Sequence, residues 1–442
     1  MAPHLGGWKM LLPGLLLLGA GDPVYRGYSL EALTRSFRVT LVDASANEWQ
    51  RAVVDKHVGI DHRDPAVVSE YVRRDLGFFD GIFTCDEFAV ETATEVGADA
   101  GLRVNSISTA RACRDKAEMR ARLKTGNVPS ARSIQVDSRD AARAAAQGIG
   151  YPVVLKPQAL AGSIGVIRVD ANSELDAAYD VAANSGHGVY GSAGGRLLVE
   201  EYLDGPEISV ECVVRDGMPE VLAVTRKSLG PAPYFEEIGH VVAPAEPVTA
   251  DDSAIFSVVQ PTHAAVGIAW GATHTELRLT RTGPRVIEIG ARPGGDLIPL
   301  LVRLATGRDQ VVEAVAAVCG VDLPTTPEGP EGSGPAAAAI RFFYPAVESR
   351  LVGLHLDPKI KAAPWLHALT REVEFGTVLR TPPHAFLDRV GFAVVRAEST
   401  DRCQQYVDIV ENGLTITCDP VTDADCSSPK NAKTADSMPI TP

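Results

Sequence analysis

The sequence predicts a mixed α/β and α+β protein in which a doubly wound domain precedes a compact α+β unit. Strand-like apolar runs alternate with helical patterns in the first part of the chain, as in a parallel sheet covered by helices. The stretch VLKPQALAGSIGVIRV at residues 154–169 places a lysine, a glycine- and serine-rich turn and a second apolar run in the order of a β-hairpin. Alternating runs at 272–280 and 284–289 predict another hairpin. The 442 residues suffice for about three domains.

The first strand candidate is the apolar run at residues 15–18, which leads into the turn Gly19-Ala20-Gly21. Two further strand candidates end at Asp43 and begin at Asp80, with helical patterns between them. This spacing predicts a small doubly wound sheet. Residue 24 is valine, so the third glycine of a dinucleotide-binding G-x-G-x-x-G fingerprint is missing, and we expect no dinucleotide site here.

The composition excludes several classes of function. The net charge of −14 argues against sequence-independent binding to nucleic acid or to an anionic membrane. The 7 cysteines are scattered and never form a C-x-x-C pair, so we expect reduced thiols and a cytoplasmic protein. The apolar run after Lys9 resembles a signal peptide, but Pro13 and Gly14 interrupt it.

The middle of the chain reads as a compact α+β unit. Residues 108–125 predict one helix that contains Lys116, has Ser108 or Thr109 as its cap and stops at residues 126–129. Strand and helix patterns then alternate through residues 133–214. A Walker-type phosphate loop would place its lysine after the glycines, whereas Lys156 precedes them here.

Six segments in chain order resemble the motifs of the ATP-grasp superfamily. They read RDKAEMR, YPVVLKP, ALAGSIGV, LLVEEYLDGPEISVE, GATHTELRL and VIEIGARPGGDLIP. The segments FEEIGH and EIGARPGG resemble more specifically the carboxylate–amine ligases, which include bacterial L-amino acid ligases. The resemblance spans residues 15 to 300 approximately, and its ordered spacing makes it specific.

The resemblance implies an ATP-grasp fold with a mobile lid, a central mixed sheet and a C-terminal accessory α+β region. The expected parts are an N-terminal domain at 1–110, an ATP-grasp domain at 111–320 with a lid at about 128–200, a linker at 321–335, an accessory domain at 336–425 and a disordered tail at 426–442.

An acidic protein that binds ATP must gather cations at one place. Lys116 and Lys156 could reach the α- and β-phosphates, and backbone N–H groups of the loop that contains Gly162, Ser163 and Gly165 could close over them. Alternatively, Lys156 is a solvated lysine at a strand end and the loop is an ordinary hairpin.

The segment EEYL follows an apolar strand and offers main-chain groups to an adenine edge. By resemblance, Glu201 and Leu203 supply backbone hydrogen bonds, while Glu200 or Glu207 meets the ribose hydroxyls. The alternative is that the two adjacent glutamates only face solvent at the edge of a sheet.

Glu276 and Glu288 are the candidate metal ligands, because carboxylates on facing strands can share a hard cation with phosphate oxygens. Two opposed acids would repel each other without a cation, although acids surrounded by water remain the alternative. We expect Mg²⁺, with Mn²⁺ as a substitute. Many ATP-grasp proteins have E-x-N, but residue 290 is glycine here, which leaves the number of ions open.

Four residues are candidates for catalysis. The guanidinium fork of Arg292 suits an acyl phosphate or the oxyanion that forms when an amine attacks it. Glu237, His240 and His274 are candidates for an amino-group pocket or for proton handling, with ordinary hydrogen-bonded loop residues as the alternative.

The sequence therefore predicts an ATP-dependent C–N ligase that joins a small-molecule carboxylate to an amine, with ATP and Mg²⁺ as cofactors and an amino acid as one substrate. One alternative is a non-catalytic nucleotide-binding or regulatory protein. Another is a biotin carboxylase-type enzyme, which the missing E-x-N disfavours. A homodimer is left open, and neither nucleic acid nor membrane is expected as a partner.

Overall fold

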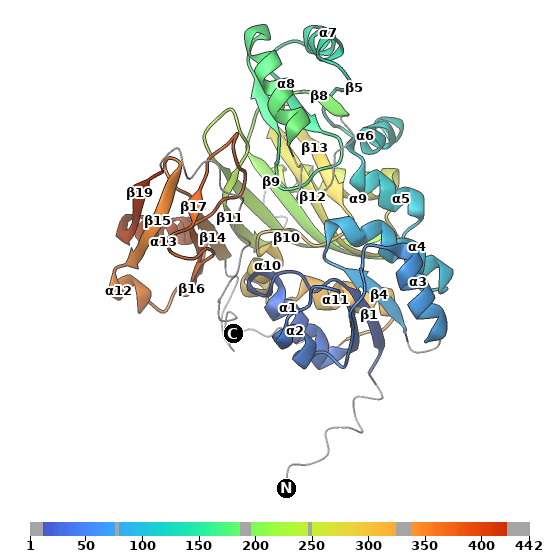
Figure 1. Cartoon of the computed structure of the whole chain (residues 1–442). Coiled ribbons are helices and arrows are strands. Elements are labelled where there is room, and N and C mark those ends of the chain that lie inside the picture. Colours follow the sequence, from blue (N-terminus) through green and yellow to red (C-terminus); the bar gives the residue numbers. More distant parts are fainter. Residues whose placement is uncertain (1–11, 76–78, 186–195, 246–249, 324–336, 422–442) are drawn as a thin grey trace.

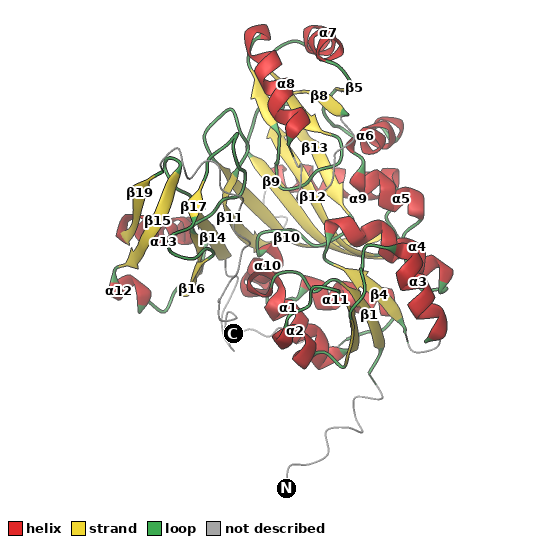
Figure 2. Ribbon diagram, in the orientation of Figure 1, coloured by secondary structure: helices red, strands yellow, loops and turns green. Residues whose placement is uncertain are grey.

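The computed structural model describes residues 12–75, 79–185, 196–245, 250–323 and 337–421 (Figures 1 and 2). Its strands form four sheets, and helices cover them in a mixed α/β arrangement. Within these ranges, no helix combines the length and the apolar character needed to cross a membrane.

The N-terminal sheet is parallel, in the order β3-β2-β1-β4, as the alternating pattern predicts. Its strands are β1 (Gly14–Leu18), β2 (Arg38–Val42), β3 (Lys56–Val58) and β4 (Gly81–Thr84). Its helices are α1 (Pro23–Ser36), α2 (Glu48–Val53), α3 (Pro65–Arg74), η2 (Glu87–Ala89) and α4 (Val90–Asp99). Helix α1 starts here because Asp22 accepts a hydrogen bond from the Val24 N–H and Pro23 occupies the first helical position.

The segment predicted as a single helix is two helices, α5 (Ile107–Arg114) and α6 (Lys116–Thr125), so that prediction was wrong. Asp115 breaks the helix because its backbone is extended and its side chain caps α6. The cap of α5 is Ser106 rather than Ser108 or Thr109. The break makes Lys116 the first residue of α6.

A four-stranded antiparallel sheet in the order β5-β8-β6-β7 forms a separate layer, which we call the lid sheet. Its strands are β5 (Ser133–Val136), β6 (Val153–Pro157), β7 (Ile167–Val169) and β8 (Leu197–Glu201). Helices α7 (Arg139–Ile149) and α8 (Leu175–Asn184) pack on it, and η3 (Asn172–Glu174) precedes α8. The lid sheet lies at the top of the molecule in Figure 1, above the long strands of the largest sheet.

The largest sheet has eight strands in the order β13-β12-β9-β10-β11-β14-β18-β16. The strands are β9 (Glu207–Arg215), β10 (Met218–Leu229), β11 (Glu237–Pro244), β12 (Gly271–Thr280), β13 (Gly283–Gly290), β14 (Ala337–Phe343), β16 (Leu366–Arg371) and β18 (Gly391–Ala397). Helices α9 (Ala250–Val266), α10 (Ile298–Thr306) and α11 (Gln310–Cys319) pack against it.

The C-terminal region extends this sheet rather than forming a detached module, because β14, β16 and β18 continue it beyond β11. The remaining C-terminal strands form a three-stranded sheet with α12 (Pro358–Lys361) and α13 (Thr400–Gly413) nearby. These strands are β15 (Ser349–Leu356), β17 (Val378–Leu379) and β19 (Leu414–Pro420). Most of the predicted linker and the whole predicted tail lie outside the described residues, and the domain boundaries stay predictions.

One hydrophobic core connects the two ends of the chain. It contains Leu15 of β1, Leu301 of α10 and Phe392 of β18. The ring of Phe392 is fully buried and lies 5.8 Å from the ring of Tyr25 and 6.0 Å from that of Phe342. The N-terminal and C-terminal regions therefore share the packing that supports the largest sheet.

We expect Phe392→Ala to lower the free energy of unfolding by about 3–5 kcal/mol, because it leaves a cavity in this shared core. Urea denaturation followed by circular dichroism would measure the loss. Phe375→Ala is the matched control, since Phe375 is 52% exposed and should change stability by less than about 0.5 kcal/mol. Equal losses in the two variants would contradict the shared core.

Candidate active site

One cavity lies between the lid sheet and the largest sheet, and most of the residues predicted for nucleotide and metal line it. The predicted residues on its wall are Lys116, Lys156, Gly162, Ser163, Glu200, Glu201, Leu203, Glu207, Glu237, Glu276 and Glu288. Gly165, His240, His274 and Arg292 do not line this cavity. The fold thus brings residues from several separate elements and loops to one place.

Lys156 is held at the end of β6 by a buried acid. Its Nζ lies 2.6 Å from Glu200 Oε2, and Arg120 of α6 forms a two-pronged contact with the same carboxylate at 2.8 and 3.0 Å. Burial alone would raise the pKa of Glu200, but Arg120 and Lys156 outweigh it and lower the pKa to about 2. Burial lowers the pKa of Lys156, although Glu200 opposes the shift. Glu200 therefore orients the lysine, and both of its oxygens are engaged.

Lys116 lies across the cavity at the start of α6. Its Nζ donates to the Leu160 carbonyl oxygen at 2.5 Å and lies 3.2 Å from Glu288 Oε2. Lys116 thereby connects the beginning of the glycine-rich loop with a candidate metal ligand. Lys116 and Lys156 come from different elements, and both line this cavity.

The glycine-rich loop contains consecutive left-handed residues, Gly162 at φ 67° and Ser163 at φ 56°, and then Gly165 at φ 72°. Among the residues that the structure describes, the N–H groups of residues 161–165 donate to no acceptor. Such a run of free backbone N–H groups forms a concave site for anions. The loop is therefore suited to phosphate oxygens.

The segment that follows β8 has a backbone N–H group with no acceptor among the described residues. The Glu201 N–H donates to the Arg132 carbonyl oxygen at 2.9 Å, whereas the Leu203 N–H donates to no acceptor within the described ranges. Glu207, the second ribose candidate, is held by Arg278 at 2.8 Å. Both ribose candidates, Glu200 and Glu207, therefore carry cationic partners already.

Glu276 and Glu288 occupy directly opposed positions of the antiparallel pair β12–β13, as predicted. Glu276 Oε1 accepts hydrogen bonds from Lys227 Nζ and, at 3.1 Å, from His274 Nε2. Burial alone would raise the pKa of Glu276, but Lys227 and His274 outweigh it and hold the pKa well below its usual value. Two opposed carboxylates offer the oxygen ligands that Mg²⁺ prefers.

His274 lies beneath Glu276 instead of facing the cavity. Its Nδ1 lies 2.9 Å from Glu211 Oε2, so the imidazole bridges two carboxylates. Burial alone would lower the pKa of His274, but Glu211 and Glu276 outweigh it and raise the pKa to about 9. His274 is therefore cationic at neutral pH and fixes the position of Glu276. This geometry favours the structural alternative over contact with a substrate.

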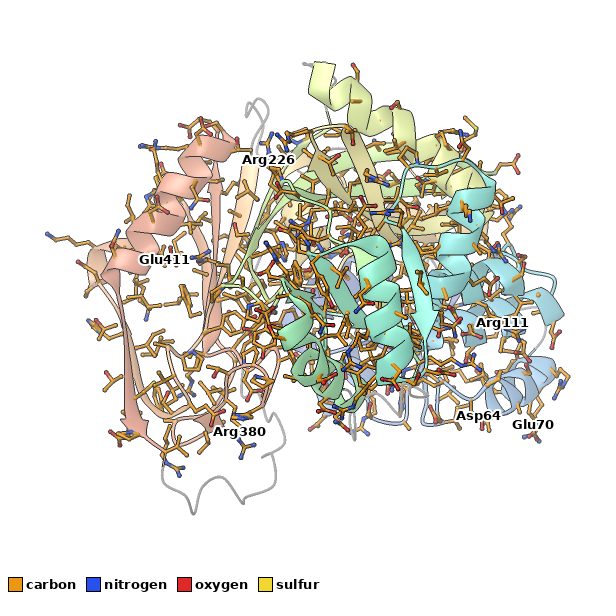
Figure 3. The ribbon with its side chains drawn as sticks, turned by 90° about the horizontal axis from the view of Figure 1, so that it is seen from above. Asp64, Glu70, Arg111, Arg226, Arg380 and Glu411 are labelled. Atoms are coloured by element: carbon orange, nitrogen blue, oxygen red, sulfur yellow. The ribbon has the colours of Figure 1, made fainter. Side chains whose placement is uncertain are left out.

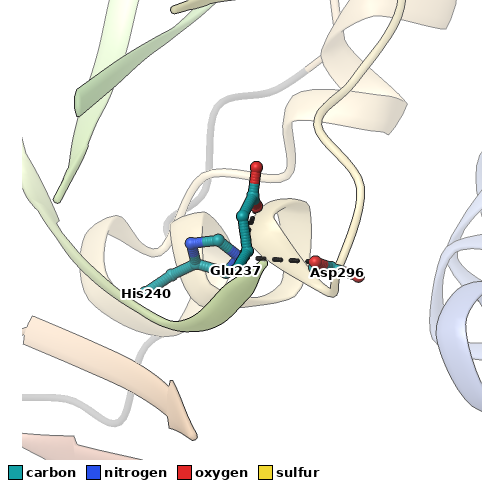
Figure 4. Close-up of side chains that lie close together, drawn as sticks. All are labelled: Glu237, His240 and Asp296. Carbon is teal, nitrogen blue, oxygen red and sulfur yellow. Dashed lines mark ion pairs between the residues drawn. The ribbon is translucent and has the colours of Figure 1, made fainter. Parts of the chain in front are cut away.

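Glu237, His240 and Asp296 form a cluster beyond the metal candidates (Figure 4). His240 Nε2 lies 3.2 Å from Glu237 Oε2 and 3.6 Å from Asp296 Oδ2. These three groups have the spacing of metal ligands, but each acid already has a cation. Lys227 lies 2.8 Å from Glu237, and Arg389 contacts both oxygens of Asp296 at 2.7 and 2.8 Å. Both acids of the cluster are therefore already paired with buried cations, which leaves little net negative charge for a second metal ion.

Arg292 is buried and bound to the N-terminal domain. Its Nε donates to Glu87, its Nη1 donates to the Pro293 carbonyl oxygen at 2.8 Å, and Arg114 contacts the same Glu87 at 2.8 Å. Arg292 is thus not part of the cavity lining and is positioned by an acid from η2.

The sequence prediction missed several charged residues that the fold brings into the site, namely Glu87, Arg120, Lys227, Asp296 and Arg389. Four of them lie in segments far along the chain from their partners, and Lys227 has one partner on the next strand and others farther away, so no local pattern gives the full set of contacts. Lys227 had one usable signal, because it is a lysine inside the long strand pattern VLAVTRKSL.

Comparison with known proteins finds relatives in both sequence and fold. Residues 149–299 match the family model described as ATP-grasp domain. The alanine–anticapsin ligase of Bacillus subtilis is 28% identical over 314 residues, which cover 65% of this chain and 64% of that protein. A phosphoribosylamine–glycine ligase of Vibrio cholerae is 33% identical over 209 residues, 44% of this chain and 48% of that protein. The chain thus spans about half to two thirds of the length of these curated relatives.

Solved structures confirm the predicted fold. The crystal structure of an L-amino acid ligase from Bacillus licheniformis aligns with a TM-score of 0.75 and 22% identity, covering 92% of this chain and 99% of that one. A phosphoribosylglycinamide synthetase from Anaerococcus prevotii aligns with a TM-score of 0.66 and 18% identity, over 92% and 99% of the two chains. The fold and the resemblance to carboxylate–amine ligases are both confirmed.

The raised pKa of His274 predicts a pH-dependent contribution to stability. An unfolded histidine has a pKa of about 6.5, so this contribution is complete below that pH and is lost as the pH rises through about 9. We expect the difference in unfolding free energy between the parent and His274→Asn to shrink by about 3 kcal/mol from pH 6 to pH 10.

His263→Asn is the matched control, because burial lowers the pKa of His263 to about 4 and it stays neutral throughout this range. Its difference from the parent should stay constant from pH 8 to pH 10 and should change by less than about 1 kcal/mol, in the opposite direction, from pH 8 to pH 6, where only the unfolded histidine takes up a proton. Urea denaturation at several pH values measures both differences, and a constant difference for His274→Asn would show that the pKa of His274 is not raised in the folded protein.

Proposed function

Because the chain carries an ATP-grasp domain, we propose that it is an ATP-dependent carboxylate–amine ligase that makes an amide or peptide bond. The observation that carries the proposal is the single cavity that combines two lysines, a loop of free N–H groups and two opposed glutamates. These parts would bind a nucleoside triphosphate and its metal at the mouth of a buried polar cluster.

The proposed nucleotide site assigns a role to each wall. Lys116 and Lys156 would contact the phosphates as point charges, and the N–H groups of residues 161–165 would close over them. The Leu203 N–H would donate to the base. Glu200 and Glu207 would meet the ribose only by sharing oxygens that already bind cations.

Glu276 and Glu288 would hold Mg²⁺, or Mn²⁺ as a substitute. When bound, the ion would neutralise charge on the transferred phosphoryl group. His274 keeps the Glu276 carboxylate ionised and in place, and Lys116 contacts the Glu288 carboxylate. With Gly290 in place of asparagine, these two carboxylates are the ligands that the β12–β13 hairpin offers.

In the proposed reaction, a carboxylate oxygen attacks the γ-phosphorus and ADP leaves, which gives an acyl phosphate. The amine nitrogen then attacks the acyl carbon and phosphate leaves, with loss of a proton from nitrogen. Positioning and charge neutralisation suffice for both steps, so no side chain need act as a covalent nucleophile. Burial raises the pKa of the Cys85 thiol, although the charge of Arg292 opposes the shift. A buried thiol with a raised pKa is a poor nucleophile.

An amino acid is the best-supported substrate. The cluster of Glu237, His240 and Asp296 can accept hydrogen bonds from an ammonium group, and Arg292 can donate to an acyl phosphate or an oxyanion. Two of the relatives are named for ligation of alanine or glycine. The free cysteines of the described residues agree with a reducing, cytoplasmic location.

The direct test is a screen of amino acid pairs for phosphate release with ATP and Mg²⁺. We expect at least one pair to release phosphate and to yield an amide that mass spectrometry identifies as the condensed product. Glu288→Gln serves as the inactive control, because it removes a metal ligand. Nucleotide binding without phosphate release for any carboxylate and amine would favour the non-catalytic alternative.

Arg292→Ala should bind Mg²⁺ and ADP about as well as the parent but should ligate the amino acid pair from the screen about a hundredfold more slowly. The reason is that Arg292 is not part of the cavity lining and would act on charge that develops only during reaction. Calorimetry would measure ADP affinity, and single-turnover kinetics would measure the rate.

Arg114→Ala is the control for a purely structural role, because Arg114 also contacts Glu87 but has no assigned part in chemistry. If Arg292 only braces Glu87, the two alanine variants should be equally slow and Arg292→Lys should recover the rate. If Arg292 acts on the reacting groups, Arg114→Ala stays active and Arg292→Lys stays slow.

A further inference from the structure

Lys227 occupies the centre of the buried acidic region and has no assigned role in the reaction above. Its side chain is 1% exposed, and its Nζ contacts three carboxylates from three strands. These are Glu276 of β12, Glu237 of β11 at 2.8 Å, and Glu207 of β9 at 3.6 Å. One ammonium group therefore lies between a candidate metal ligand and the proposed substrate cluster.

Two of these acids also contact a second cationic side chain. Glu207 is also held by Arg278 at 2.8 Å, and Glu276 is also held by His274 at 3.1 Å. Lys227 and His274 both donate to Oε1 of Glu276, and Oε2 has no hydrogen-bond partner among the described residues. The metal candidate thus keeps one oxygen for a cation while two positive groups already offset its charge.

Charges around the proposed metal position are nearly balanced by groups of the protein itself. The groups connected by these contacts include one more carboxylate than cations. The carboxylates are Glu207, Glu211, Glu237, Glu276 and Glu288, and the cations are Lys116, Lys227, Arg278 and His274. A divalent cation that enters this region alone meets little net negative charge and is repelled by Lys227 at close range. Nucleotide phosphates would supply the missing negative charge, so the balance favours metal that arrives together with phosphate.

We propose that Lys227 is a counter-cation that pairs with Glu276 in the absence of nucleotide. This pairing suppresses metal binding until nucleotide is present. When Mg²⁺ and nucleotide bind, Lys227 releases Glu276 and keeps its contact with Glu237. Lys227 is thus a positioning residue that connects metal loading with the Glu237–His240–Asp296 cluster. This inference rests on the proposed function, because it takes the Glu276–Glu288 pair as the metal site.

The experiment titrates Mn²⁺ into the full-length protein without nucleotide and follows free Mn²⁺ by electron paramagnetic resonance, which reports binding without turnover. We expect Lys227→Met to bind Mn²⁺ at least about tenfold more tightly than the parent, because one positive charge beside Glu276 is gone. Lys227→Arg keeps that charge and should bind as weakly as the parent. Equal affinities for the parent and Lys227→Met would overturn the inference.

Arg226→Met is the matched control. Arg226 precedes Lys227 in β10, but its side chain is exposed, so its loss should leave the Mn²⁺ affinity unchanged (Figure 3). A similar gain in Arg226→Met and Lys227→Met would show that only the overall charge matters, which would contradict a specific role for Lys227.

A second measurement does not require the methionine variant to fold. Saturating ADP should tighten Mn²⁺ binding to the parent by at least about tenfold, because the negative charge of its phosphates offsets the positive charge of Lys227. Mn²⁺ binding to the parent that is equally tight with and without ADP would overturn the inference. Failure of the parent to bind Mn²⁺ and ADP together under any condition would instead overturn the proposed function. Where Lys227→Met folds, its gain with ADP should be smaller than that of the parent.

Discussion

Carboxylates buried in a cavity must be paired before a ligand arrives, and this constraint determines much of the site. An unpaired buried charge is penalised by several kcal/mol, so each acid is placed with at least one cation from another element. Glu200 has Lys156 and Arg120, Glu276 has His274 and Lys227, and Asp296 has Arg389. The site is therefore organised by its own ion pairs. Under the proposed function, binding would exchange these pairs for contacts with phosphate and metal.

The pairing requirement also explains why the site needs every part of the chain. Arg389 comes from the C-terminal region, Glu87 comes from η2 in the N-terminal region, and both contact residues of the loop after β13. Asp296 and the next residue, Leu297, have left-handed backbones that side chains rarely adopt, at φ 48° and 62°. The two-pronged contact with Arg389 and the buried position of Leu297 hold this turn in place. The accessory region thus contributes to the site through a contact behind it, besides extending the sheet.

Sequence patterns predicted what depends on neighbours along the chain. The parallel N-terminal sheet, the opposed Glu276 and Glu288, and the loop at 161–165 all follow from short-range periodicity and turn residues. The break at Asp115 could have been anticipated, because aspartate followed by a lysine-rich helical pattern is a common helix start. The partners of Lys227 and Arg389 could not, since they depend on strand order in an eight-stranded sheet. Individual residues were thus predictable where chemistry is local, while the pairs that tune them were not.

Strand order also gives the two halves of the site different mechanical properties. The metal candidates and Lys227 lie on β12, β13 and β10 of one continuous hydrogen-bonded sheet, so their mutual distances are fixed by ladder geometry. Lys156 and the glycine-rich loop belong to the smaller lid sheet, whose own core is separate from the cores beneath the largest sheet. Movement of the lid sheet would therefore change the distance between the lysine and the carboxylates without disturbing either group of charges internally. A reaction that depends on positioning and charge neutralisation can use this arrangement. The largest sheet would fix the charges around the metal, and closure of the lid sheet would bring the phosphate-contacting groups towards them.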